Sequence, residues 1–156
     1  QEDINELKAN DPTGFTQLDN LKDVSGNAVD VYIGRTDTYS NGNGGTEFSY
    51  NTAESIIYTS ETRGGAATRP NSVTTWVMNS PADGKSQPQI ISHEIGHILD
   101  MAANPAAYWA NRSNWTSMNC QVDVTNPYAI PALNSENAYN ALPKTYVRKT
   151  YIKPTH

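Results

Sequence analysis

The chain has 156 residues and a formal net charge of -5, and charged residues make up 17% of it. Its length predicts one domain, residues 1–156, that can bury a core without disulfide staples. The acidic balance offers no basic surface for nucleic acid, and no apolar run is long enough for a membrane span, so neither kind of partner is expected.

The amino-acid composition indicates in which compartment the protein is found. Asn, Thr and Ser are abundant, Lys is scarce, and the chain begins at Gln1, a pattern typical of a mature product from which a leader has been removed. We therefore expect a secreted protein. The single Cys120 allows no internal disulfide, and a buried, inert thiol is favoured over a nucleophile.

The first half of the chain predicts two short helices followed by strands. Apolar residues at helical spacing lie on both sides of a turn at 11–14 and predict two short surface helices within 1–24. Residues 28–33, 55–59 and 72–78 are rich in β-branched residues and predict strands, with a polar loop at 41–45. A mixed sheet of three or more strands follows.

Residues 90–101 read I-I-S-H-E-I-G-H-I-L-D-M and contain the pattern H-E-x-x-H. Positions four apart share one face of a helix, so His93 and His97 can direct their imidazoles at one metal ion. Glu94 can reach a water held on that metal, which suits a general base. Gly96 allows another segment to approach closely. Two histidines and a glutamate on a largely apolar helix are costly to bury without a chemical role.

The chain changes character after this helix. Asn104-Pro105 ends it, since proline disfavours the helical conformation in the residue before it. Residues 106–115 predict a further helix with three aromatic residues, and 123–131 predict an irregular loop. Residues 134–142 predict a short helix with Ser135 near its start.

A catalytic zinc usually has three protein ligands, and the motif supplies two. Asp100 lies on the same rigid helix and is better placed to hydrogen-bond a ligand histidine than to complete a tetrahedron. Asp123 is a weak candidate, and the terminal His156 is not favoured. Elimination leaves Glu136, in the helix predicted over 134–142, with Asp123 and Asp100 as alternatives.

The motif H-E-I-G-H-I-L-D, followed later by S-E-x-A-x-x-A-L, resembles the catalytic domain of anthrax lethal factor and the small secreted Pro-Pro endopeptidases of clostridia. The resemblance implies zinc (Zn²⁺) bound by His93, His97 and Glu136, with Glu94 as the general base. It further implies that Tyr128, shortly before Glu136, faces the metal and stabilises the oxyanion.

The resemblance covers the motif helix and about eight residues around Glu136. Asn137 and Tyr139 stand where aromatic and acidic residues are common in that family. The register before Glu136 also leaves Tyr139 and Tyr108 as alternatives to Tyr128.

These features predict an α+β fold: a single zincin-like domain whose small mixed sheet packs on the H-E-x-x-H helix, with further helices C-terminal to it. The predicted function is that of a secreted, monomeric zinc metalloendopeptidase acting on protein or peptide substrates. Within the strand at 72–78, residues 73–78 are the candidate edge that binds the substrate backbone. The alternative is a secreted zinc-containing binding module or effector without peptidase activity.

Overall fold

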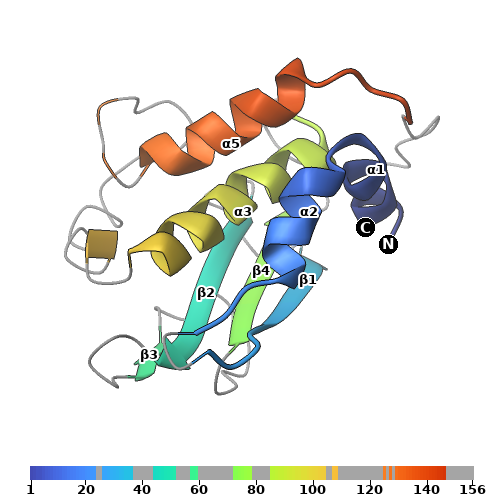
Figure 1. The fold of residues 1–156 in the computed structure, drawn as a ribbon. Helices are drawn as coiled ribbons and strands as arrows, with labels where there is room; N and C mark the ends of the chain where they lie inside the picture. The colour runs from blue at the N-terminus through green and yellow to red at the C-terminus, as the bar shows by residue number, and fades with distance from the viewer. Residues whose placement is uncertain are drawn as a thin grey trace.

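The computed structural model describes residues 1–23, 26–36, 44–51, 57–59, 72–78, 85–104, 107–108, 125, 127 and 129–146. In chain order, the elements are α1 (Glu2–Asn10), α2 (Pro12–Asp19), β1 (Asp30–Thr36), β2 (Gly44–Asn51), β3 (Ile57–Thr59), β4 (Ser72–Met78), α3 (Gln87–Ala103) and α5 (Ala129–Ala141). Figure 1 shows α3 between the sheet and α5. The motif helix is therefore the central layer of the described structure.

The four strands form one mixed sheet in the order β1-β4-β2-β3. β1 and β4 are parallel, whereas β2 is antiparallel to both β4 and β3. Strands were predicted near β1, β3 and β4, but β2 was not, because its first residues belong to the glycine-rich segment interpreted as a loop.

The position of β4 contradicts one prediction. Residues 73–78 of this strand were expected to be an edge that binds substrate by strand addition. β4 pairs with β1 on one side and with β2 on the other, so its backbone hydrogen-bonding groups are already used by the sheet. The edges of the described sheet are β1 and β3. Strand addition to β4 is thus ruled out.

Helix α3 begins and ends where its sequence dictates. Ser86 is the N-cap, and its Oγ accepts the backbone N–H of Gln89 at 3.3 Å. Pro88 lies in the first turn, where no intrahelical donor is needed. The helix ends at Ala103, directly before Asn104, as predicted. It contacts β2, β4, α1, α2 and α5, which explains why most of its apolar residues are buried.

The two N-terminal helices were predicted correctly in position but not in role. Asp11 accepts the backbone N–H of Gly14 at 3.0 Å and caps α2. Leu7, Phe15 and Leu18 are buried in a single hydrophobic cluster with residues of β4, α3 and α5. α1 and α2 are therefore part of the core and are not merely surface helices.

Helix α5 begins earlier than predicted. It starts at Ala129 instead of near Asn134, so the predicted loop over 123–131 is helical in its last three residues. Pro131 does not stop this helix, because the first turn needs no backbone donor. Ser135 accordingly lies inside the helix and is not a cap. Every helix in the described ranges is too short or too polar to span a lipid bilayer.

Candidate functional site

The two histidines of α3 lie side by side. Their ring centroids are 5.1 Å apart, the ring planes meet at 77°, and both side chains are buried. The pKa of His97 is held well below its usual range, mainly by burial and to a smaller extent by the charge of the neighbouring His93. His97 is therefore neutral at physiological pH, which is the state in which an imidazole nitrogen can bind a metal.

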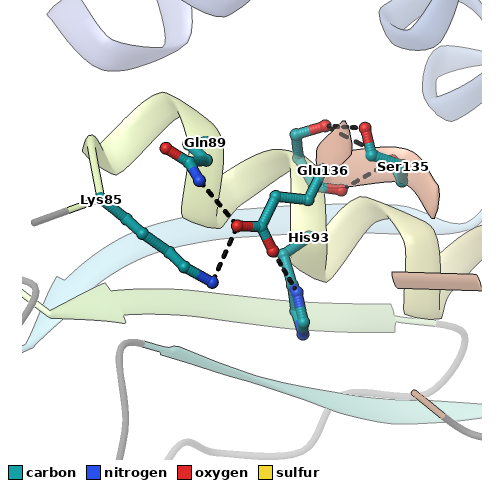
Figure 2. A network of polar contacts seen from close by, with 6 residues as sticks. Lys85, Gln89, His93, Ser135 and Glu136 are labelled. Atoms are coloured by element: carbon teal, nitrogen blue, oxygen red, sulfur yellow. Dashed lines mark hydrogen bonds and ion pairs between the residues drawn. The ribbon is translucent and has the colours of Figure 1, made fainter. Parts of the chain in front are cut away.

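Glu136 of α5 reaches His93, as Figure 2 shows. Its Oε2 lies 2.9 Å from Nδ1 of His93. Its Oε1 accepts a hydrogen bond from Nε2 of Gln89 at 2.7 Å and lies 2.8 Å from Nζ of Lys85. Both carboxylate oxygens are thus held by side chains from the first two turns of α3 or from the residue segment just before it.

The charge state of Glu136 follows from these contacts. Burial by itself raises its pKa, but hydrogen bonds with His93, Lys85 and Gln89 and the charge of Lys85 lower it to about 2. Glu136 is therefore ionised at neutral pH. An ionised carboxylate beside an imidazole can bind a metal directly or can fix the orientation of the ring.

A glycine allows α5 to lie close enough to deliver Glu136. A Cβ built on Gly96 would lie 2.7 Å from Cα of Ala132 and 2.7 Å from the carbonyl oxygen of Pro131. Backbone atoms cannot move aside as a flexible side chain can, so only glycine fits at this contact. The prediction that Gly96 permits a close approach is confirmed.

A pair of serines fixes the register between the same two helices. Ser92 Oγ donates to the carbonyl oxygen of Ser135 at 3.1 Å, and Ser135 Oγ donates to the carbonyl oxygen of Ser92 at 2.8 Å. Because Glu136 directly follows Ser135 and His93 directly follows Ser92, this reciprocal pair places the carboxylate beside the imidazole (Figure 2).

Glu94 is supported from the sheet. Its side chain is buried, and its Oε2 accepts a hydrogen bond from Thr46 Oγ1 of β2 at 2.6 Å. Thr46 Oγ1 also lies 3.1 Å from Thr75 Oγ1 of β4. A carboxylate that follows a potential ligand histidine and is fixed by a hydroxyl group suits a general base.

The donor types fit zinc, although the described residues do not form a closed ligand set. Two neighbouring buried imidazoles and an ionised carboxylate are the ligands that catalytic zinc sites use. Glu136 lies beside His93. Within the described ranges, however, no three His, Cys, Asp or Glu side chains are gathered closely enough to hold a metal ion.

The remaining candidates have different outcomes. Asp123 and Tyr128 lie outside the described residues, as do Cys120 and His156. Asp100 is half-buried, and burial raises the pKa of its carboxyl group. It follows His97 by one turn of the same helix, and the role predicted for it stays a prediction.

The two alternative tyrosines are both buried. Tyr139 lies next to Asn10 of α1, and its pKa is raised by burial although the hydrogen bond with Asn10 opposes the shift. The ammonium group of Lys144 lies 4.4 Å from the centroid of its ring. Tyr108 is part of the hydrophobic cluster. These surroundings give both tyrosines packing partners in the core.

Sequence reasoning missed four side chains that support the site. Gln89 continues the four-residue spacing of His93 and His97 backwards along one face of α3, and Lys85 lies four residues further back, just before the helix; this spacing could have revealed them. Thr46 and Thr75 carry no such sequence signal, because they meet only through the pairing of β2 with β4, in which they are directly opposite. Their positions depend on a strand register that the sequence leaves open.

Comparison with known proteins found no matching family model, no similar curated protein and no similar solved structure. The site is therefore interpreted from its own residues.

Proposed function

We propose that the chain is a secreted, monomeric zinc metalloendopeptidase that hydrolyses protein or peptide substrates. The observation that carries this proposal is the buried H-E-x-x-H helix, whose two imidazoles are neighbours and whose intervening glutamate is held by a hydroxyl group. Burying these polar side chains is unfavourable in any fold. A metal-binding and catalytic role of the motif would explain why they are buried here.

In this proposal His93 and His97 supply two ligands, and Glu136 supplies the third. Its support is that Glu136 is buried, ionised and 2.9 Å from His93. Zinc bound by these residues would lower the pKa of a bound water toward neutrality and polarise the scissile carbonyl. Asp123 and Asp100 are the alternative third ligands.

Glu94 performs the proton transfers in this mechanism. Its carboxylate accepts a proton as water attacks the peptide carbonyl, and then delivers that proton to the leaving amine. Tyr128 is proposed to donate a hydrogen bond to the oxyanion, a role that rests on the family resemblance alone. Burial of Glu94 keeps bulk water from competing for its carboxylate.

The test is cleavage of a diverse peptide library, read by mass spectrometry, with and without a zinc chelator. We expect defined cleavage products that disappear with the chelator and return when Zn²⁺ is added back. Stoichiometric zinc without any cleavage, together with a large fall in melting temperature on chelation, would instead identify a structural zinc site in a binding module or effector.

A further inference from the structure

A short chain of hydroxyl groups connects the sheet to the proposed general base. Thr46 of β2 and Thr75 of β4 are directly opposite each other in the antiparallel pair. Their Oγ1 atoms are 3.1 Å apart, and Thr46 Oγ1 lies 2.6 Å from Oε2 of Glu94. Thr75 is fully buried, so this contact lies inside the layer between the sheet and α3.

The direction of the hydrogen bonds follows from counting protons. A threonine hydroxyl group has one proton to donate, and an ionised carboxylate can only accept. Thr46 must therefore donate its proton to Glu94. The proton between the two hydroxyl groups then comes from Thr75, which leaves Thr46 as its acceptor. Thr75 thus fixes the rotation of the Thr46 hydroxyl group, and Thr46 fixes the carboxylate.

We propose that Thr46, supported by Thr75, is a positioning residue for Glu94. It holds Oε2 toward the sheet and so restricts the rotation of the carboxylate that would take the proton in peptide hydrolysis. A hydrogen bond to a charged acceptor is stronger than one between neutral groups, so this bond can hold the carboxylate in one orientation. The consequence for peptide hydrolysis rests on the proposed function, whereas the positioning itself does not.

Kinetics of hydroxyl variants test the consequence for hydrolysis. Thr46→Val keeps the β-branched shape and removes the donor, and we expect kcat to fall by at least about 10-fold with KM nearly unchanged. Thr46→Ser restores the hydroxyl group and should recover most of the activity, while Thr75→Val should show a smaller loss. Thr16→Val is the matched control, since Thr16 Oγ1 donates only within α2 at an exposed position. Wild-type kcat in Thr46→Val would overturn the proposal.

A double-mutant cycle on the metal-free protein tests the positioning without any need for activity. Unfolding equilibria are measured for the unmodified protein, Thr46→Val, Glu94→Ala and the double variant. If the two side chains are in direct contact, the effect of the double variant on the unfolding equilibrium constant should differ by a factor of about 10 from the combined effects of the two single variants. Simple additivity would overturn the proposal. Clear coupling in a protein that cleaves no peptide would support the positioning and reject the peptidase function.

Discussion

The protonation states of His97 and Glu136 are those that a divalent metal requires. Burial keeps the imidazole neutral, and contacts with Lys85, Gln89 and His93 keep the carboxylate ionised despite its burial. In the proposed site, a neutral imidazole and an ionised carboxylate would need no change of protonation to bind a metal ion.

The buried imidazole of His97 makes the metal-free protein sensitive to acid. The unfolded chain binds a proton at this residue near pH 6.5, whereas the folded chain does so only at much lower pH. The unfolding free energy should therefore fall as the pH drops below 6.5, by up to about 1.4 kcal/mol per pH unit from this residue. Urea titrations between pH 7.5 and 5.5 measure it. His97→Gln should reduce the slope, and an unchanged slope in this variant would contradict the assignment.

Glu136 should be essential for tight metal binding. Glu136→Gln keeps the shape and removes the charge, and we expect zinc affinity to fall by at least about 10- to 100-fold. Competition with a chromophoric chelator measures the dissociation constant. Glu2→Gln, at an exposed position in α1, makes the same change of charge and should leave affinity unaltered. A zinc affinity of Glu136→Gln equal to that of the unmodified protein would show that the third ligand is another residue.

At the level of elements, the contact between α3 and α5 positions the site. The backbone of α5 touches Gly96, and the reciprocal Ser92–Ser135 hydrogen bonds fix how the two helices align. A change in this contact moves Glu136 relative to His93, although neither residue is altered.

Gly96→Ala should therefore destabilise the protein although alanine is the better helix former. The added methyl group would meet the backbone of α5, and overpacking of this kind costs about 1–3 kcal/mol. Gly34→Ala is the control, because a Cβ at Gly34 has no neighbour within 4 Å. Thermal unfolding of both variants measures the difference. A Gly96→Ala protein as stable as the unmodified chain would mean that α5 does not approach as described.

The elements also explain what the sequence could and could not predict. The motif helix was predictable because its apolar periodicity and the proline that follows it agree. β2 was missed because glycines at its start resemble a loop, and the early start of α5 was missed because Pro131 resembles a helix breaker. His93, Glu94 and His97 follow from spacing on one helix, whereas Thr46 depends on how separate strands pair.

At the scale of the whole molecule, α1 is joined to the segment that follows α5. Asn10 Oδ1 accepts the backbone N–H groups of Thr145 at 2.8 Å and Tyr146 at 3.2 Å, and its Nδ2 donates to the carbonyl oxygen of Tyr146 at 2.7 Å. These bonds connect residues far apart in the sequence and hold the segment that follows α5 against α1.

Asn10→Ala should lower stability without changing metal affinity. Loss of the side chain removes the acceptor of two backbone donors in the C-terminal segment. Because these residues are exposed, water replaces that acceptor in part, and we expect a loss of about 1 kcal/mol. Chemical denaturation measures the loss, and Asn5→Ala at an exposed position of α1 is the control. A stability equal to that of the unmodified protein would mean that the C-terminal segment is held by other contacts.

The most direct test of a metal-dependent peptidase compares the unmodified protein with Glu94→Gln after reconstitution with Zn²⁺. We predict that both bind one zinc ion per chain with similar affinity, and that Glu94→Gln cleaves peptides at least about 100-fold more slowly. Zinc content by elemental analysis and cleavage by mass spectrometry are measured on the same samples. Undiminished cleavage by Glu94→Gln, or failure of the unmodified protein to bind zinc, would contradict the assignment of this helix as the catalytic centre.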